Sequence, residues 1–247
     1  MFRHLSRRAK KIWASIALLS IEMIVVLSIF ILSLITFAYM VRRVFFLQNN
    51  SFDQGVFDYL QQYVNPTTNK FMLFVTHFGS HKVLIPAFLS LIAYFLFIKK
   101  HRWYSIKVPA IGLSSLALMF ILKNLFNRDR PLIPLLESVN GLSFPSGHAL
   151  MSMTFYGLLV YITYQSVQNK TAKWTIITLL LLFILLIGFS RIYLKVHYTS
   201  DVLAGFAMGW LWIVISLKAI RQLEKKSRKE IDPVVQQAPA AEIESVK

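Results

Sequence analysis

The sequence predicts an all-α protein, a polytopic membrane helix bundle of six transmembrane helices with one short interfacial helix. Of the 247 residues, 56% are hydrophobic and 15% are charged, whereas soluble domains average about 45–50% apolar and about 25% charged residues. The apolar residues form long runs, each near the roughly 20 residues that a helix needs to cross the hydrocarbon core. The charged residues gather in the short segments between these runs.

Six apolar runs define the expected spans, which cover residues 14–41, 72–98, 106–126, 149–167, 174–194 and 202–220. The expected organisation is a basic cytoplasmic N-terminus over 1–11, one membrane domain over 12–220, and a disordered cytoplasmic tail over 221–247. The first run is too long for a signal-peptide core, so we expect it to be retained as a transmembrane helix.

Residues 49–69 are too polar to span a bilayer but carry a helical pattern. Apolar residues recur at every fourth position, at Phe52, Val56, Leu60 and Val64. This spacing places them along one helical face, and Pro66 is expected to end the helix. We interpret the segment as a short helix lying on the headgroups; a plain surface loop is the alternative.

The basic residues predict the orientation. With six spans both termini share one side, and 18 of the 27 Lys and Arg residues fall on that side. Because cytoplasmic segments carry the excess of Lys and Arg, we expect both termini in the cytoplasm of a plasma (inner) membrane protein. The formal net charge of +16 is then explained by contacts with lipid headgroups, and no nucleic acid partner is expected.

Three polar clusters lie at the ends of these spans, all on the expected outer face. They are Lys123-x6-Arg130-Pro131, Pro145-Ser146-Gly147-His148 and Ser190-Arg191-x5-His197-x3-Asp201. Together they supply cations, a helix start and two histidines. A phosphoryl-transfer site that works without a metal ion needs these groups.

His197 and Asp201 are four residues apart and share one helical face. A carboxylate bonded to one imidazole nitrogen fixes the tautomer and leaves the other nitrogen free to attack. Arg191 can grip phosphate oxygens through two parallel hydrogen bonds. Considered alone, the pair is better explained as an interfacial histidine and an aspartate that caps the last helix, and the neighbouring Arg191 and Ser190 favour the phosphate site.

The other two clusters also favour an anion. A helix start such as that at Ser146 and Gly147 exposes backbone amides, which attract negative charge, and His148 follows directly. Lys123 lies just inside the apolar boundary, where an ammonium group is costly unless it is paired. An ordinary helix start and a snorkelling lysine are the structural alternatives.

We expect neither a metal nor a cofactor. The sequence lacks the clustered carboxylates that would hold Mg²⁺. His77 and His81 have a ligand-like spacing but no evident third partner. Asp129 is expected to neutralise Arg128 or Arg130 in a structural role.

In their order and spacing the clusters resemble the type 2 phosphatidic acid phosphatase superfamily of membrane lipid phosphatases. The family signature reads K-x6-R-P, P-S-G-H and S-R-x5-H-x3-D, and every position is filled here. The resemblance covers about residues 50–215, including Thr76-His77-Phe78-Gly79-Ser80 at the start of the second span.

The resemblance implies a role for each matching residue. His197 would form a phosphohistidine, Asp201 would orient it, and His148 would protonate the leaving lipid oxygen and then activate water. The phosphate oxygens would be bound by Lys123, Arg130, Arg191, Ser146 and Gly147. The substrate would be a lipid phosphate at the outer leaflet: phosphatidic acid, phosphatidylglycerophosphate or a polyprenyl pyrophosphate.

Two other functions remain open. A lipid phosphotransferase would use the same phosphohistidine and hand the phosphoryl group to an alcohol. A non-catalytic anion- or lipid-binding membrane protein would need the cations, but neither a nucleophile nor a proton donor. Relatives that bind vanadate for haloperoxidase chemistry are soluble, which separates them from this chain.

Overall fold

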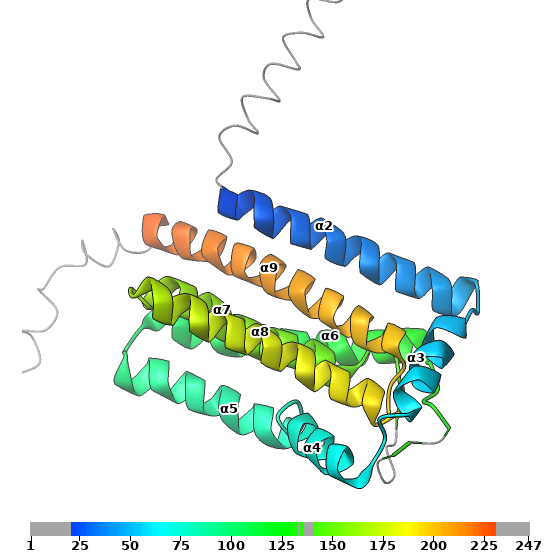
Figure 1. The fold of residues 1–247 in the computed structure, drawn as a ribbon. Coiled ribbons are helices and arrows are strands. Elements are labelled where there is room, and N and C mark those ends of the chain that lie inside the picture. The colour runs from blue at the N-terminus through cyan, green and yellow to red at the C-terminus, as the bar shows by residue number, and fades with distance from the viewer. Residues whose placement is uncertain (1–20, 133, 136–140, 231–247) are drawn as a thin grey trace, which may run out of the picture.

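The computed structural model describes residues 21–132, 134–135 and 141–230, and all regular structure in these ranges is helical. The long helices lie side by side, and the short helix α3 (Ser51–Gln61) lies across one end of the bundle (Figure 1). The remaining helices are α2 (Ile21–Val41), η1 (Arg42–Phe46), α4 (Pro66–His77), α5 (His81–Ala93), η2 (Tyr94–Ile98), α6 (Arg102–Phe126), α7 (Gly147–Ser166), α8 (Lys170–Tyr193) and α9 (Thr199–Glu230).

Five stretches within the described residues are long and apolar enough to cross a membrane. They are Glu22–Phe46, Pro66–Ile98, Arg102–Phe126, Lys170–Tyr193 and Thr199–Ser227. This confirms the all-helical membrane fold. α7 is not among the five, so the expected count of six spans is not reached by apolarity alone. The reason is that α7 is enclosed by protein, with Ser152 and Thr154 fully buried, and such a helix needs no apolar surface for lipid.

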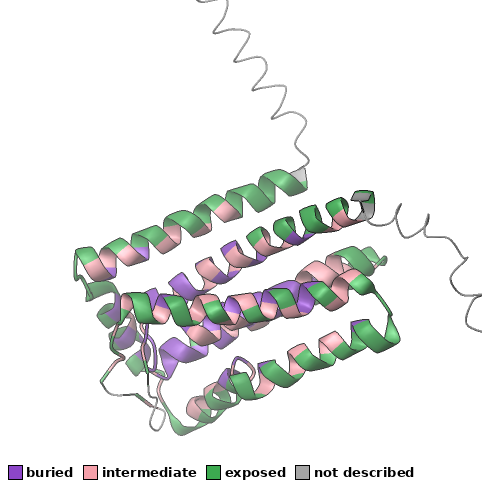
Figure 2. Cartoon of the chain, turned by 180° about the vertical axis from the view of Figure 1, so that it is seen from behind, coloured by how far each residue is buried: buried purple, intermediate pink, exposed green. Residues whose placement is uncertain are grey.

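Burial decreases from the inner helices of the bundle to the outer ones. Buried residues concentrate on the inner helices, whereas α2 is exposed along most of its length (Figure 2). α2 packs chiefly against α9 and leaves Leu32 and Ile35 62% and 58% exposed. Contiguous apolar surface of this kind marks a lipid-facing or protein-facing side, and the composition of α2 fits lipid.

The contact between α7 and α9 fixes the helix starts that carry the site. A Cβ atom at Gly205 would lie 2.7 Å from the carbonyl oxygen of Ser146, and one at Gly209 would lie 2.8 Å from that of Leu150. Small residues are what let two membrane helices approach this closely. At the end of this contact the backbone N–H of Ser146 donates to the carbonyl oxygen of Asp201 at 3.0 Å.

The expected second span, 72–98, is a broken helix that starts earlier. α4 begins at Pro66, with the side chain of Asn65 accepting two backbone N–H groups as its N-cap. Pro66 therefore starts a helix, and the expectation that it ends one is wrong. Proline suits this position because the first helical N–H needs no partner inside the helix. The chain then turns at Phe78-Gly79-Ser80 before α5 begins.

A helix does form within residues 49–69, and its buried face keeps Leu60 of the expected set but also includes Asp53 and Phe57. Asp53, Phe57 and Leu60 are buried, whereas Phe52, expected on the apolar face, is 38% exposed. The side of α3 that carries Asp53, Phe57 and Leu60 faces the bundle, so the buried side of the helix includes a carboxylate. The buried position of Asp53 requires partners inside the protein.

α9 continues to Glu230, so the expected start of the tail at residue 221 falls inside a helix. Lys, Glu and Gln are good helix formers, and they dominate this extension. Glu224 also accepts a hydrogen bond from Lys107 of α6 at 2.9 Å, which ties the extension to the bundle. The expected N-terminal segment 1–11 and residues 231–247 lie outside the described residues.

Candidate active site

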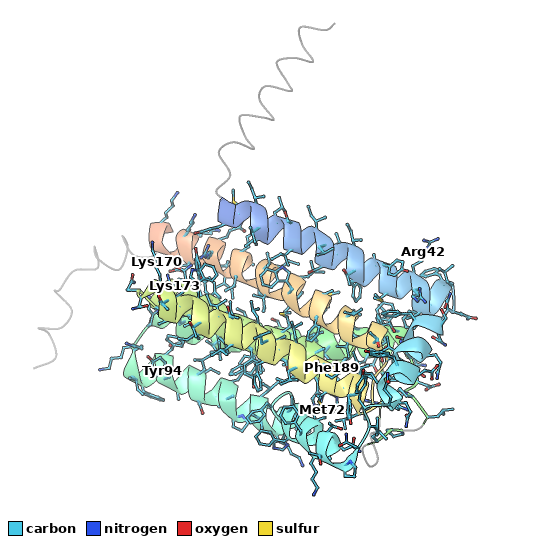
Figure 3. The ribbon with its side chains drawn as sticks, viewed as in Figure 1. Arg42, Met72, Tyr94, Lys170, Lys173 and Phe189 are labelled. Atoms are coloured by element: carbon cyan, nitrogen blue, oxygen red, sulfur yellow. The ribbon has the colours of Figure 1, made fainter. Side chains whose placement is uncertain are left out.

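The three clusters meet at one end of the bundle, next to α3. They come from the end of α6, the start of α7, the end of α8 and the start of α9, which reach the same end because neighbouring helices are antiparallel (Figure 1). Arg42 also lies towards this end, whereas Tyr94, Lys170 and Lys173 lie at the opposite end (Figure 3).

His197 lies at the centre of the site and is 1% exposed. Its Nδ1 is 3.4 Å from Oδ2 of Asp201 and 3.3 Å from Oγ of Ser143. Its Nε2 is 3.2 Å from Nη1 of Arg130. An ionised carboxylate can only accept, so the proton belongs on Nδ1 and the lone pair on Nε2.

The charge state of His197 follows from its surroundings. Burial lowers the pKa of its imidazole well below the ordinary 6.5, and the positive charges of Arg130, Arg191 and Lys123 lower this pKa further. Desolvation and like charges both penalise the protonated ring. The imidazole is therefore uncharged at neutral pH, the form in which Nε2 can act as a nucleophile.

Asp201 is fully buried and has several donors besides His197. Nη1 of Arg128 donates to Oδ1 at 2.6 Å, and the backbone N–H of Tyr198 donates to Oδ2 at 3.0 Å. The hydroxyl of Ser143 also donates to Oδ2. The carboxylate is held on several sides, which fixes the position from which it contacts the imidazole.

Arg128, Asp53 and Ser143 are site residues that the sequence analysis did not identify. Arg128 pairs with Asp201 and, through Nη2, with Oδ2 of Asp53 at 3.0 Å. The expectation that Asp129 neutralises Arg128 or Arg130 is therefore wrong for Arg128. In the sequence, Asp53 is visible only as a carboxylate within an amphipathic helix. That pattern does not identify Arg128, 75 positions away, as its partner.

Lys123 and Arg130 are bound to backbone carbonyl groups. Nζ of Lys123 donates to the oxygen of Leu142. Arg130 donates from Nε to Gly141 and from Nη1 to Val196, both at 2.8 Å. These acceptors carry no net charge, so both cations keep their attraction for an anion.

Arg191 is 3% exposed, and its Nη1 donates to Oγ1 of Thr76 at 2.7 Å. Its Nε is buried and has no hydrogen-bond partner among the described residues. A buried guanidinium with unused donors is unfavourable by itself, and an anion with several oxygens would satisfy it.

Ser146 and Gly147 form the start of α7. Ser146 is fully buried, and its Oγ caps the helix by accepting from the N–H of Ala149 at 3.5 Å. The hydroxyl proton remains available to another acceptor. A Cβ atom at Gly147 would lie 2.7 Å from Sδ of Met119, so a larger residue here would have to displace the flexible side chain of Met119.

His148 follows on the first turn of α7, near the break between α4 and α5. A Cβ atom at Gly79 would lie 3.0 Å from Cδ2 of its ring. The positive charges of Arg191 and Arg130 act on His148, and its ring is close enough to that of His197 for the two to interact. The second histidine therefore belongs to the same group of residues as the first.

The geometry agrees with comparisons to known proteins. The family model of the PAP2 superfamily matches residues 103–225. Phosphatidylglycerophosphatase B of Bacillus subtilis is 30% identical over 148 residues, which cover 59% of this chain and 72% of the relative. Undecaprenyl-diphosphatase of Sulfolobus acidocaldarius is 30% identical over 173 residues, which cover 67% of this chain and 77% of the relative.

A solved structure shows the same fold. The crystal structure of the first transmembrane PAP2 type phosphatidylglycerolphosphate phosphatase from Bacillus subtilis matches with a TM-score of 0.68 and 25% identity. The match covers 80% of this chain and 96% of that one. The motif resemblance is thus confirmed by the family model, by sequence relatives and by the fold. The chain belongs to the PAP2 superfamily and is an integral membrane phosphatase.

Proposed function

We propose that this protein is a lipid phosphatase that removes a terminal phosphate from a monoester or pyrophosphate lipid through a phosphohistidine at His197. One observation carries the proposal. An uncharged, buried imidazole has Asp201 at Nδ1 and Arg130 at Nε2, 3.2 Å away. This arrangement combines a nucleophile with the positive charge that its reaction needs.

In the first step Nε2 of His197 attacks the phosphorus atom, and the bond from phosphorus to the leaving lipid oxygen breaks. His148 gives its proton to that oxygen. Asp201 stabilises the positive charge that develops on the His197 ring. The phosphoryl oxygens are bound by the cationic and start-of-helix groups Lys123, Arg130, Arg191, Ser146 and Gly147.

In the second step His148 takes a proton from a water molecule, and the water oxygen attacks phosphorus. The bond from phosphorus to Nε2 breaks, which releases inorganic phosphate and restores the neutral His197. Each well-aimed donor to the phosphoryl oxygens contributes about a hundredfold to a thousandfold in rate in comparable sites. The cations fill this role in the proposed mechanism, so no metal or other cofactor is required.

The membrane setting favours a lipid substrate. The relatives named above act on a phosphatidylglycerophosphate and on an undecaprenyl diphosphate by their names. The lipid-facing helices leave a route for acyl or prenyl chains from the side, while the phosphate reaches the polar end of the bundle. The substrate class is accordingly phosphatidic acid, phosphatidylglycerophosphate or a polyprenyl pyrophosphate.

We further propose six membrane crossings, with α7 as the fourth. The membrane domain then covers 12–220, α3 lies at the outer interface, and the site opens to the outer face. Segment 1–11 and the residues that follow α9 are cytoplasmic. Exposed lysines at the opposite end, among them Lys99, Lys100 and Lys170, support this orientation.

Phosphate release tests the reaction. The purified protein in detergent with EDTA should release phosphate from at least one of the three lipid classes. His197→Ala should lower the rate by about 10⁴-fold or more, because the nucleophile is removed, and His148→Ala should be nearly as severe. His101→Ser is the matched control, since His101 only caps α6 at the far end and serine is a good cap. Failure of the wild-type protein on all three classes would overturn the proposal.

Trapping tests the intermediate. A lipid labelled with ³²P in its terminal phosphate should leave an acid-labile, base-stable label on the wild-type protein and none on His197→Ala. Added alcohols should not collect the phosphoryl group. Their phosphorylation at the expense of free phosphate would identify a phosphotransferase instead.

Cysteine labelling tests the orientation, because the chain contains no cysteine. Leu132→Cys places a thiol at a residue 96% exposed at the site end, and Gln168→Cys places one in the exposed turn at the opposite end. A membrane-impermeant maleimide should label the first variant in intact spheroplasts and the second only after permeabilisation. The reverse pattern would put the site on the cytoplasmic face.

A further inference from the structure

Arg128 lies between two buried carboxylates. Its Nη1 donates to Oδ1 of Asp201 at 2.6 Å and its Nη2 donates to Oδ2 of Asp53 at 3.0 Å. The side chains of the two aspartates are 0% and 3% exposed, and that of Arg128 is 10% exposed. One guanidinium thus joins α3 to the carboxylate that contacts His197.

Asp53 also binds the start of α9 directly. Its Oδ1 accepts from the backbone N–H of Ser200 at 2.9 Å, and its Oδ2 accepts from the hydroxyl of Ser200 at 2.6 Å. A carboxylate is favourable at a helix start because the first N–H groups of a helix have no partner within it. Asp53 therefore fixes the first turn of α9, the turn that carries Asp201, from a helix about 147 positions away in the chain.

We infer that Arg128 and Asp53 are positioning residues for the reaction at His197, an inference that rests on the proposed function. Arg128 holds Asp201 aimed at the imidazole, and Asp53 holds Arg128 and the start of α9 in place. Through Asp53, α3 therefore helps to position the residues that act in the reaction. Neither residue touches the substrate.

The donors of Arg128 show why it does not bind phosphate. Nη1 is shared between Asp201 and Ser200, and Nη2 between Asp53 and Asn50, at 2.6 to 3.2 Å. Its guanidinium also stacks on the ring of Tyr198, with 4.0 Å between Cζ and the ring centroid. Arg191, by contrast, keeps a buried donor without a partner among the described residues.

The inference has an electrostatic signature. Removing the positive charge of Arg128 favours protonation of His197, so the acid limb of kcat/KM moves to higher pH. Removing the negative charge of Asp53 has the opposite sign and moves the limb to lower pH. The other charged or titratable groups around His197 are the same in every variant: Lys123 of α6, Arg130 of the following loop, His148 of α7, Arg191 of α8 and Asp201 of α9.

The test is the pH dependence of kcat/KM for phosphate release by the full-length protein. Arg128→Gln should lower kcat/KM by about 100-fold and Asp53→Asn by about tenfold, the range usual for groups that orient a catalytic ligand. The acid limb should rise by about half a pH unit or more for Arg128→Gln and fall for Asp53→Asn. The inhibition constant of inorganic phosphate should stay within about twofold of the wild-type value in both variants.

Asp58→Asn is the matched control, since Asp58 lies exposed on the same helix and its carboxylate accepts a hydrogen bond only from Gln54 among the described residues. It should leave the rate and the acid limb unchanged. A residue that only stabilises the fold would lower the amount of active protein and leave the limb in place. Limbs that do not move in either variant, or that move in the same direction, would overturn the inference.

Arg128→Lys keeps the test decisive if Arg128→Gln does not fold. An ammonium group retains the charge but cannot bridge two carboxylates in a planar fork, so kcat/KM should fall about tenfold with the limb unmoved. A weakened phosphate affinity in this variant would show instead that Arg128 binds the substrate. A wild-type protein that is inactive on every lipid would overturn the proposed function and this inference together. An active wild-type protein whose Arg128→Gln and Asp53→Asn variants keep the acid limb in place would overturn this inference alone.

Discussion

The two ends of the bundle contain the same residue types in different surroundings. At the site end Arg191 is buried and the side chain of Arg128 is 10% exposed, and Arg128 bonds to the carboxylate of Asp201 at 2.6 Å. At the opposite end, basic side chains contact tyrosines near the surface. Arg221 donates to the hydroxyl of Tyr161 at 3.1 Å, and Nζ of Lys173 lies 5.2 Å from the ring centre of Tyr164. Burial separates a reactive cationic site from an interfacial anchor.

The physical reason is the dielectric environment. An exposed cation is solvated by water and screened by salt, so it attracts an anion weakly. A buried cation keeps its field, and it is stable only when an anion or several dipoles face it. The site end therefore favours an incoming phosphate, whereas the opposite end favours the lipid surface.

The same substitution at the two ends gives the largest expected contrast. Arg191→Lys should lower kcat/KM by about 100-fold, because the planar guanidinium proposed to bind the phosphate is lost. Arg221→Lys should stay within about twofold of the wild type, as exposed substitutions usually do. Phosphate release from the preferred lipid measures both. Equal losses in the two variants would remove the distinction between the ends.

A glycine pair tests how strictly the helix starts are held. Gly205→Ala would place a Cβ 2.7 Å from the carbonyl oxygen of Ser146 and 2.9 Å from Cβ of Ala149, so α7 and α9 must separate. We expect about 1–3 kcal/mol lower stability and about tenfold lower activity, since small misplacements of reacting groups are costly.

Gly55→Ala is the control for this pair, because a Cβ there meets nothing within 4 Å. It should raise stability by about 0.5–1 kcal/mol through helix propensity. Thermal unfolding and kcat/KM are measured for both variants. An active and stable Gly205→Ala protein would show that the α7–α9 contact does not determine the site.

The pH profile tests the charge state of the nucleophile. Burial and nearby cations lower the pKa of His197 well below 6.5, and the neutral ring is the reactive form. As pH falls, protonation of His197 should therefore lower kcat/KM only below the ordinary histidine range, after correction for ionisation of the lipid phosphate and of His148. An acid limb of the enzyme at 6.5 or above would contradict a desolvated nucleophile.

The opposite end should affect stability and not catalysis, which gives the smallest expected change in activity. Glu224→Gln leaves Lys107, 5% exposed, without this carboxylate, and we expect a loss of about 1–3 kcal/mol of stability. The activity per folded molecule should not change. Combining it with Lys107→Met should recover part of the loss, and a drop in kcat/KM of folded protein would mean that the two ends are coupled.

The parts of the site that sequence predicts are those carried by local patterns. His197 and Asp201 are four residues apart, and Ser146 to His148 are contiguous, so their spacing could be read directly. Arg128 was visible but received the wrong partner, Asp129, because neighbours in sequence are the easiest carboxylates to consider. The break at Phe78-Gly79-Ser80 was missed because both flanking segments are apolar enough to be parts of one span.

The amino-acid sequence by itself determined the all-helical membrane fold and the three clusters, because hydrophobic run length and short spacings are properties of neighbouring residues. Only the tertiary structure decided that Asp53 of α3 contacts Asp201 through Arg128, and that α7, which carries the second histidine, is enclosed by protein. These contacts join residues far apart in the chain, and they form only when the helices pack. Burial of the joined charges then makes the partners depend on one another, which no local pattern encodes.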